Sequence, residues 1–166
     1  MAVHDDADLR PDDPSFVGAF RGEPGLEDVQ VHVGGVFGLP APEIADALRR
    51  FERTLQTIVA RLDNAIPTSA EPNAGQVRAI VEACAWAHAE WVRIHPFANG
   101  NGRTARTWVN FLALRYGLPP FVSLRPRPGF GYALACGHAM HGDWQPTVTV
   151  LVRLFEDYCL RLGASV

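Results

Sequence analysis

Features that would assign a protein to a membrane or to an oxidising compartment are missing from this sequence. Its apolar runs all fall short of the roughly 20 residues that a membrane-spanning helix needs. The first residues, Met-Ala-Val-His-Asp-Asp, are acidic and lack the apolar core of a signal peptide. Cysteine occurs only three times, at wide spacing and without a CxxC pair, which is typical of reduced thiols. We therefore expect a cytoplasmic protein with no membrane partner.

An excess of positive charge is missing as well. The 166 residues include 15 basic and 18 acidic side chains, which give a net charge of −3 and an isoelectric point near 6.0. Proteins that bind nucleic acid without sequence specificity usually present a strongly basic surface to the phosphate backbone. The composition therefore argues against a nucleic-acid partner.

Length and apolar content indicate one domain. Apolar residues make up 48% of the chain, and a chain of this length buries roughly two thirds of its unfolded surface on folding. Residues 1–14 contain five Asp and two Pro, a composition that favours a flexible acidic lead-in. We therefore expect a single domain over residues 15–166.

Two kinds of apolar spacing predict the secondary structure. Residues 29–33 alternate as Val-Gln-Val-His-Val before Gly34-Gly35, which predicts a short strand and half of a β-hairpin. Helical spacing recurs in five segments, of which the last is expected to pack Leu162 with the rest of its apolar face. These segments cover about 40–62, 77–95, 103–116, 131–140 and 143–162. The predicted fold is therefore mainly α, with four or five helices and one hairpin.

Residues 95–106, between two predicted helices, combine features of an anion-binding site. Gly100 and Gly102 flank Asn101 where a helix should begin, so several backbone N–H groups lack intrahelical partners. The helix dipole favours an anion at that end, and glycine allows the backbone to approach a phosphate closely. The segment therefore predicts a phosphate-binding loop.

Charged and titratable side chains in the same segment suit a nucleotide. Arg103 and Arg106 are three residues apart, so both project from one face of the expected helix. Two guanidinium groups beside such a loop suit the distal phosphates of a nucleotide. His95 precedes Pro96, which should end the preceding helix, and its imidazole could accept a proton from an attacking hydroxyl. Phosphate binding and base catalysis are thus predicted for one loop.

Two other interpretations apply to the same residues. The Gly-Asn-Gly stretch is also typical of a tight connection between helices, with the arginines exposed to solvent. Residues 100–105 match the dinucleotide fingerprint GxGxxG/A, but that fingerprint needs a strand before it, and here a helix is expected. The dinucleotide interpretation is therefore rejected, whereas the tight connection stays open on spacing alone.

The segment as a whole resembles the signature of the Fic family, HPFx[DE]GN[GK]RxxR. Eight of the nine defined positions match, and the similarity extends over about residues 15–160. The matching residues are His95, Pro96, Phe97, Gly100, Asn101, Gly102, Arg103 and Arg106. The resemblance implies a Fic-fold helical bundle with a short β-hairpin, the flap. It further implies transfer of a nucleoside monophosphate, usually AMP from ATP, to a hydroxyl of a target protein.

The resemblance also implies a role for each matched position. His95 would be the general base, and Phe97 would anchor the loop in the core. The α- and β-phosphates would bind at Gly100, Asn101 and Gly102, and the distal phosphates at Arg103 and Arg106. The flap, formed by Val31, His32, Val33 and Gly34, would align the target segment by strand addition.

One position departs from the family pattern. Asn99 stands where Fic proteins carry the acidic residue that usually holds Mg²⁺, and an amide oxygen is a weaker ligand for this hard cation than a carboxylate. Mg²⁺ would then arrive with the triphosphate. A binding module whose catalysis is weak or lost is the alternative function. Gly100 and Gly102 favour nucleotidyl transfer over the phosphoryl transfer of the Doc branch, which has other residues there.

A regulatory element of the family is not evident. Many Fic proteins carry an inhibitory helix, [ST]xxxE[GN], but no Ser or Thr from Ser15 to Thr149 has Glu four residues later. This predicts either an inhibitor supplied by a separate antitoxin-like protein or an enzyme that needs no restraint. The chain would in the first case be the toxin-like half of a two-protein pair.

Two further residues carry simpler expectations. His88 lies seven residues before His95 on the same apolar face, which favours a core histidine over a ligand. Tyr132 either flanks the adenine or packs in the core, and the sequence does not distinguish these two positions.

Overall fold

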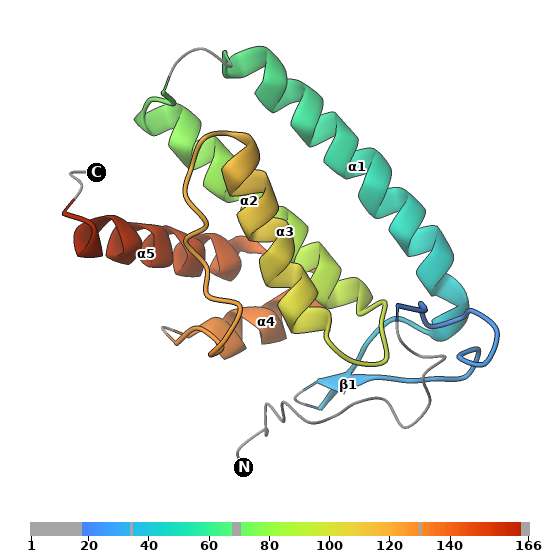
Figure 1. The fold of residues 1–166 in the computed structure, drawn as a ribbon. Coiled ribbons are helices and arrows are strands. Elements are labelled where there is room, and N and C mark those ends of the chain that lie inside the picture. The colour runs from blue at the N-terminus through green and yellow to red at the C-terminus, as the bar shows by residue number, and fades with distance from the viewer. Residues whose placement is uncertain (1–17, 34, 68–70, 130, 164–166) are drawn as a thin grey trace.

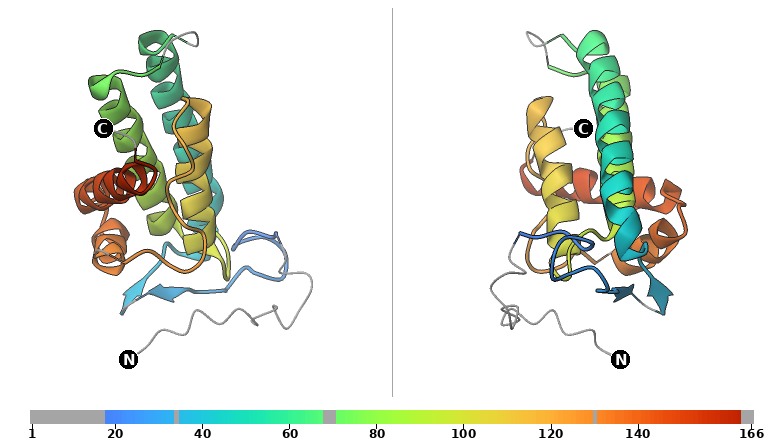
Figure 2. Two further views of the ribbon diagram at one scale, coloured as in Figure 1. Left: turned by 60° about the vertical axis from the view of Figure 1, so that its left-hand side comes forward. Right: turned by 90° about the vertical axis from the view of Figure 1, so that its right-hand side faces the viewer.

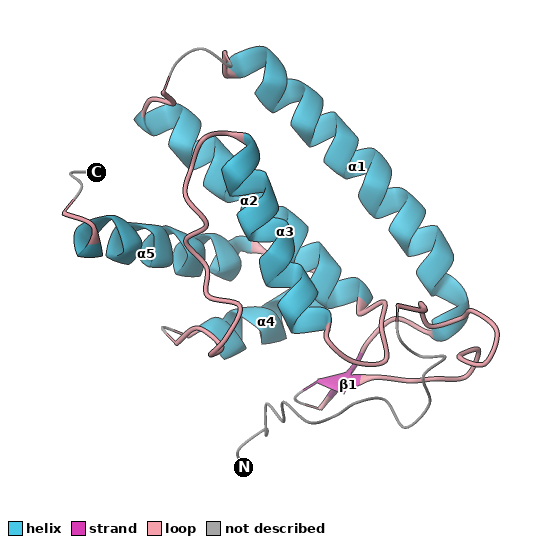
Figure 3. Ribbon diagram, in the orientation of Figure 1, coloured by secondary structure: helices cyan, strands magenta, loops and turns pink. Residues whose placement is uncertain are grey.

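A computed structural model describes residues 18–33, 35–67, 71–129 and 131–163. These residues form five helices, a short 3₁₀ turn and a two-stranded hairpin, so the predicted mainly α fold is confirmed (Figure 3). The predicted lead-in 1–14 and Gly34 of the flap lie outside these residues. No helix among them is long and apolar enough to cross a membrane.

The helices begin and end close to the predicted positions. After the 3₁₀ turn η2 (Ala41–Glu43) they are α1 (Ile44–Ala65), α2 (Ala74–Ile94), α3 (Asn101–Arg115), α4 (Tyr132–Met140) and α5 (Gln145–Arg161). One expectation was wrong. Leu162 is 66% exposed, because it lies beyond the end of α5 at Arg161.

Helix α2 is the centre of the bundle and contacts the other four helices (Figure 1). A helix surrounded in this way must be apolar on most of its circumference. Its buried residues include four alanines at every second position, whose small side chains let neighbouring helices approach closely. These are Ala83, Ala85, Ala87 and Ala89. The end of α2 is therefore held rigidly, and the residues that follow it are positioned by the whole core.

The start of α2 is fixed by a capping box. Asn73 accepts a hydrogen bond from the Gln76 backbone N–H at 3.0 Å, and the Gln76 side chain accepts one from the Asn73 N–H at 2.9 Å. The Gln76 amide also donates to the carbonyl of Ala65, the last residue of α1, at 2.7 Å. The cap therefore stabilises α2 and its connection to α1 together.

We expect Asn73→Ala to lower the free energy of unfolding by about 1 kcal/mol, because the first turn of α2 loses a side-chain acceptor. Urea unfolding followed by circular dichroism measures this change. Asn64→Ala is the matched control, since Asn64 is exposed in the last turn of α1. Equal losses in the two variants would contradict the assignment of the cap.

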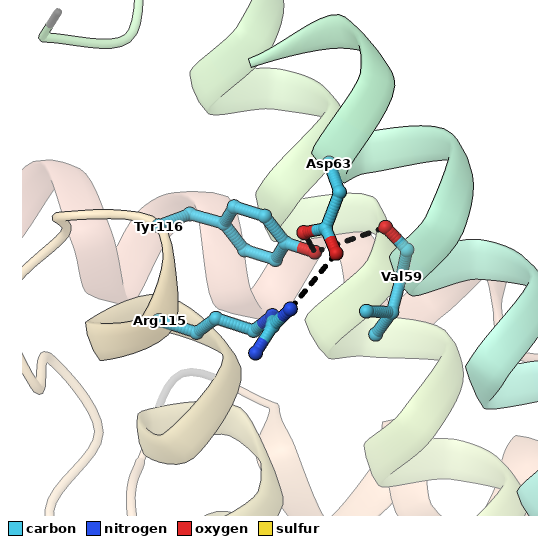
Figure 4. Close-up of polar contacts among 4 residues, drawn as sticks. All are labelled: Val59, Asp63, Arg115 and Tyr116. Carbon is cyan, nitrogen blue, oxygen red and sulfur yellow. Dashed lines mark hydrogen bonds and ion pairs between the residues drawn. The ribbon is translucent and has the colours of Figure 1, made fainter. Parts of the chain in front are cut away.

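The far end of α3 is attached to α1 through one carboxylate (Figure 4). Arg115 donates to Asp63 at 2.8 Å, and the Tyr116 hydroxyl lies 2.9 Å from the same carboxylate and 3.2 Å from the Val59 carbonyl. The Arg115 guanidinium, followed by the Tyr116 hydroxyl, holds the pKa of Asp63 below its ordinary value. These contacts keep α3 aligned with the bundle, so that its opposite end has a defined place.

The hairpin lies at the same end of the bundle as the loop between α2 and α3 (Figure 2). Strands β1 (His32–Val33) and β2 (Val36–Phe37) pair antiparallel, with His32 opposite Phe37 and Val33 opposite Val36. The predicted strand is thus shorter than residues 29–33, and the predicted hairpin is present. Its position brings two segments that are far apart in the sequence to one end of the molecule.

Candidate active site

The loop between α2 and α3 begins with a left-handed turn at His95. Its φ of 52° is the one positive value among the non-glycine residues that the structure describes. The following Pro96 disfavours the right-handed helical region for His95, so the helix ends where the sequence predicted. Non-glycine residues in this conformation are uncommon and occur often at functional sites.

A single hydrogen bond determines which nitrogen of His95 can act as a base. Its Nδ1 lies 2.7 Å from the carbonyl oxygen of Val92. A carbonyl only accepts, so Nδ1 carries the hydrogen and Nε2 keeps a free lone pair. Burial, with a smaller contribution from the charge of Arg21, lowers the pKa of His95, while the Val92 bond opposes this shift. The imidazole is therefore neutral near pH 7 and able to accept a proton at Nε2.

Arg21 is a residue of this site that the sequence analysis missed. Its guanidinium donates to three carbonyl oxygens, those of His95 at 2.8 Å, Ile94 at 3.1 Å and Val29 at 3.1 Å. Its backbone N–H donates to Pro96 O at 2.8 Å. The residue is only 1% exposed. A lone arginine in an aperiodic segment gives no sequence signal for such burial.

The middle of the loop is closed by Asn101 and anchored by Phe97. The Asn101 side chain accepts from the Phe97 N–H and donates to the Phe97 carbonyl, both at 2.8 Å. The Phe97 ring stacks on Phe20 at 4.9 Å between centroids and lies 6.1 Å from Trp91. Because both polar atoms of the Asn101 side chain are engaged, this residue offers an anion its backbone N–H.

The start of α3 gathers two glycines and two arginines. Gly100 has a φ of 89° and precedes the first turn, whose leading N–H groups have no intrahelical acceptors. A methyl group on Gly100 would lie 3.4 Å from an Nη atom of Arg103, and one on Gly102 equally close to an Nη atom of Arg106. Each guanidinium therefore lies against a glycine, and the sequence-predicted phosphate residues are together at one helix end.

The two arginines differ in burial. Arg103 is exposed, whereas Arg106 is 3% exposed and donates to the carbonyl of Leu124 at 2.8 Å and to the Tyr132 hydroxyl at 3.3 Å. Its Nε has no partner among the described residues. Arg106 is thus held in place and retains an unused donor.

Tyr132 links Arg106 to His88 in the core. The Tyr132 hydroxyl lies 2.6 Å from Nε2 of His88, which is fully buried, so the predicted core histidine is confirmed. Burial, and then the charge of Arg106, lower the pKa of His88 to about 3. The Tyr132 oxygen also accepts from Arg106, and the tautomer of His88 decides whether its Nε2 accepts from or donates to the hydroxyl. Nδ1 of His88 is buried and has no partner among the described residues. The sequence had left the place of Tyr132 open, and the structure shows it in the core.

Asn99, which replaces the acidic residue of the family signature, lies at the surface of the loop. Asn99 is exposed, and its Oδ1 accepts a hydrogen bond from the Gly100 N–H at 2.6 Å. Among the described residues there is no group of three His, Cys, Asp or Glu side chains that could hold a metal ion. The side chain at this position therefore offers a metal ion one neutral oxygen, which also accepts from Gly100.

The flap passes close to His95, and Gly38 makes this approach possible. Its N–H donates to the carbonyl of Val31 at 3.0 Å. A methyl group on Gly38 would lie 2.8 Å from Val31 Cγ2, 3.1 Å from His95 Cβ and 3.3 Å from a guanidinium nitrogen of Arg21. The segment after β2 thus packs directly on the base and on the arginine that caps α2.

We expect Gly38→Ala to lower the free energy of unfolding by roughly 1–3 kcal/mol, because the added methyl has no space. It should also displace the His95 ring, which NMR of the imidazole nitrogens detects. Gly137→Ala is the matched control, since a methyl there meets no atom within 4 Å and replaces a helical glycine of α4. A neutral effect of Gly38→Ala on both readouts would contradict the close packing.

Comparison with known proteins places these features in context. The model of the Fic/DOC family matches residues 15–113. The chain is 38% identical over 76 residues to a protein adenylyltransferase Fic of Nematostella vectensis, a match covering 46% of this chain. The proteins of the same name from Drosophila persimilis and Drosophila melanogaster are 36% and 34% identical over 110 residues, or 66% of this chain. Each match covers only 18% of the relative's own length.

Proposed function

This chain belongs to the Fic/DOC family, and on that basis we propose that it is a protein nucleotidyltransferase that transfers AMP from ATP to a hydroxyl side chain of a target protein. The relatives it resembles are named protein adenylyltransferases. The matched region includes His95 and Gly100 of the loop, and Gly102 and the two arginines of α3.

The observation that carries the proposal is the state of His95. Its Nδ1–H is fixed on the Val92 carbonyl, so the basic nitrogen has one defined direction. The lowered pKa keeps that nitrogen unprotonated at neutral pH. A histidine with these two properties, in the loop that also carries the phosphate-binding residues, suits general-base catalysis of an attack on phosphorus.

The proposed reaction has one chemical step. The hydroxyl oxygen of the target attacks the α-phosphorus of the nucleotide and forms a new P–O bond. The bond between the α-phosphorus and the oxygen that bridges to the β-phosphate breaks, and pyrophosphate leaves with that electron pair. The hydroxyl proton passes to Nε2 of His95. The products are a target carrying a nucleoside monophosphate and free pyrophosphate.

The triphosphate would bind at the start of α3. The leading N–H groups of the helix and the positive end of its dipole favour an anion there. Arg103 is exposed and free to turn toward the distal phosphates, whereas Arg106 is already oriented by Leu124 and Tyr132. Little side-chain entropy is then lost when Arg106 binds a phosphate. This arrangement supports in-line positioning as the main source of rate.

The flap would align the target. Val31 and Val33 are half-buried, and His32 between them is exposed. A two-stranded hairpin has an open edge, and an extended peptide can add to such an edge through backbone hydrogen bonds. This edge lies at the same end of the bundle as the loop with His95 (Figure 2).

The described residues do not fit a magnesium ion held by the protein. Magnesium prefers carboxylate oxygens with near-octahedral geometry. The loop supplies the neutral amide oxygen of Asn99 instead, which also accepts from the Gly100 N–H. We propose that Mg²⁺ enters with the triphosphate.

Asn99 also favours a second candidate function, a nucleotide-binding module whose catalysis is weak or lost. Restraint by a separate antitoxin-like partner remains a prediction.

Mass spectrometry tests the proposed reaction directly. The purified chain is incubated with Mg²⁺ and each nucleoside triphosphate, alone and with a cell lysate supplied with α-phosphate-labelled nucleotide. We expect a mass gain of one nucleoside monophosphate, or label in a lysate protein, that disappears in His95→Ala. An added phosphate would instead assign phosphoryl transfer. Nucleotide binding without transfer in both arms would favour the binding module.

A further inference from the structure

We propose that Arg21 is a positioning residue that joins the flap to the end of α2 and thereby fixes the imidazole of His95. Its effect on catalysis rests on the proposed function, whereas its effect on the geometry of His95 does not. The residue belongs neither to the loop signature nor to the hairpin. It lies in a third segment, which precedes the hairpin in the sequence.

The contacts of Arg21 connect three parts of the chain. Its guanidinium bonds Ile94 and His95 at the end of α2, and also Val29 two residues before Val31 of the flap. Its own backbone binds Pro96. The Val31 carbonyl in turn accepts from Gly38, which packs on His95 and on Arg21. Together these contacts connect Arg21, the flap and the end of α2 around the turn that carries His95.

Arginine suits this position better than any other side chain. The last carbonyls of a helix lack intrahelical donors, and leaving them buried and unpaired is costly. The planar guanidinium directs its N–H groups outward in a fixed fork, which reaches three carbonyls in different segments at once. A lysine ammonium carries the same charge but cannot maintain this fork. The side chain is therefore required for its shape as well as for its charge.

The charge of Arg21 also affects the end of α2 and the protonation of His95. Positive charge is favourable at a helix C-terminus. The same charge disfavours an imidazolium at His95, and Arg21 is the one charged group that contributes to lowering the pKa of His95 among the described residues. No described carboxylate lies within ion-pairing distance of Arg21. Burial is the main cause of the lowered pKa of His95, and the charge of Arg21 adds to it.

The test compares Arg21→Lys with the unmodified chain by NMR, using Arg53→Lys on the exposed surface of α1 as the matched control. Nitrogen shifts of the His95 ring report its tautomer, and hydrogen exchange of the Gly38 amide reports the attachment of the flap. We expect Arg21→Lys to give a mixed tautomer and at least tenfold faster Gly38 exchange. Where transfer is measurable, kcat should fall roughly ten- to hundredfold, with the KM for nucleotide little changed.

Each outcome decides the proposal. Unchanged tautomer and Gly38 exchange in Arg21→Lys would overturn it, whether or not the chain transfers nucleotide. If Arg21→Lys fails to fold, the unmodified chain gives the answer, because three carbonyl bonds must restrict rotation of the guanidinium and separate its Nη proton resonances. Averaged resonances would overturn the proposal, and separate ones would support it. Absence of transfer in the unmodified chain would reject the proposed function and leave these NMR readouts valid.

Discussion

Replacing His95 with alanine is expected to lower nucleotidyl transfer by about 10²- to 10⁴-fold, the usual contribution of a general base. The variant loses the Nε2 lone pair that would accept the hydroxyl proton. Nucleotide affinity should change little, because the residues proposed to hold the triphosphate begin at Gly100. Single-turnover transfer measures the first quantity, and titration of nucleotide by fluorescence or calorimetry measures the second.

His141→Ala provides the matched control, since this histidine is exposed just after α4. It should leave transfer and nucleotide binding unchanged. A parallel loss of affinity and rate in His95→Ala would indicate that the loop had collapsed. Full transfer by His95→Ala would mean that another group removes the proton, and our assignment of the base would be wrong.

The same histidine predicts the pH dependence of transfer. The base must be neutral to work, so kcat/KM should fall as the pH drops through the pKa of His95. Burial lowers that pKa below its ordinary value of 6.5. The acid limb of the profile should therefore lie below pH 6.5. A limb above that value would contradict the buried, neutral imidazole.

Much of the site could be predicted because its residues are contiguous. The end of α2 at His95 follows from Pro96, and the start of α3 near Asn101 follows from the flanking glycines. Local rules of this kind act within a few residues of sequence. They place the base in the loop and the two arginines in the helix that follows it, without any knowledge of the fold.

The role that sequence reasoning missed, that of Arg21, and the one it left open, that of Tyr132, depend on contacts across long separations. Arg21 lies 74 residues before His95, to whose carbonyl it donates, and Tyr132 lies 26 residues after Arg106. Neither contact produces a periodic pattern in the sequence, because each depends on a single buried side chain. Only the packing of α4 against α2 decides that Tyr132 reaches His88 and Arg106. Such roles need the three-dimensional arrangement.

Asn99→Asp is expected to raise the rate of transfer on the order of tenfold or more, because it introduces the carboxylate that a hard cation prefers. Aspartate has nearly the shape of asparagine, and its oxygen can still accept the hydrogen bond from Gly100 that Asn99 accepts at 2.6 Å. The change therefore adds charge and leaves the loop geometry intact. Transfer measured over a range of Mg²⁺ concentrations should also reach half its maximum at lower Mg²⁺.

Two further variants separate the metal from other effects of the substitution. Asn99→Ala removes the acceptor for Gly100 without adding a ligand, so it should lower transfer or leave it unchanged. Asn64→Asp adds the same charge on exposed α1 and should not alter the rate. A gain specific to Asn99→Asp would identify a transferase whose metal binding is impaired. If Asn99→Asp changes neither nucleotide affinity nor transfer, Asn99 does not limit the reaction, and the binding-module interpretation loses the residue on which it depends.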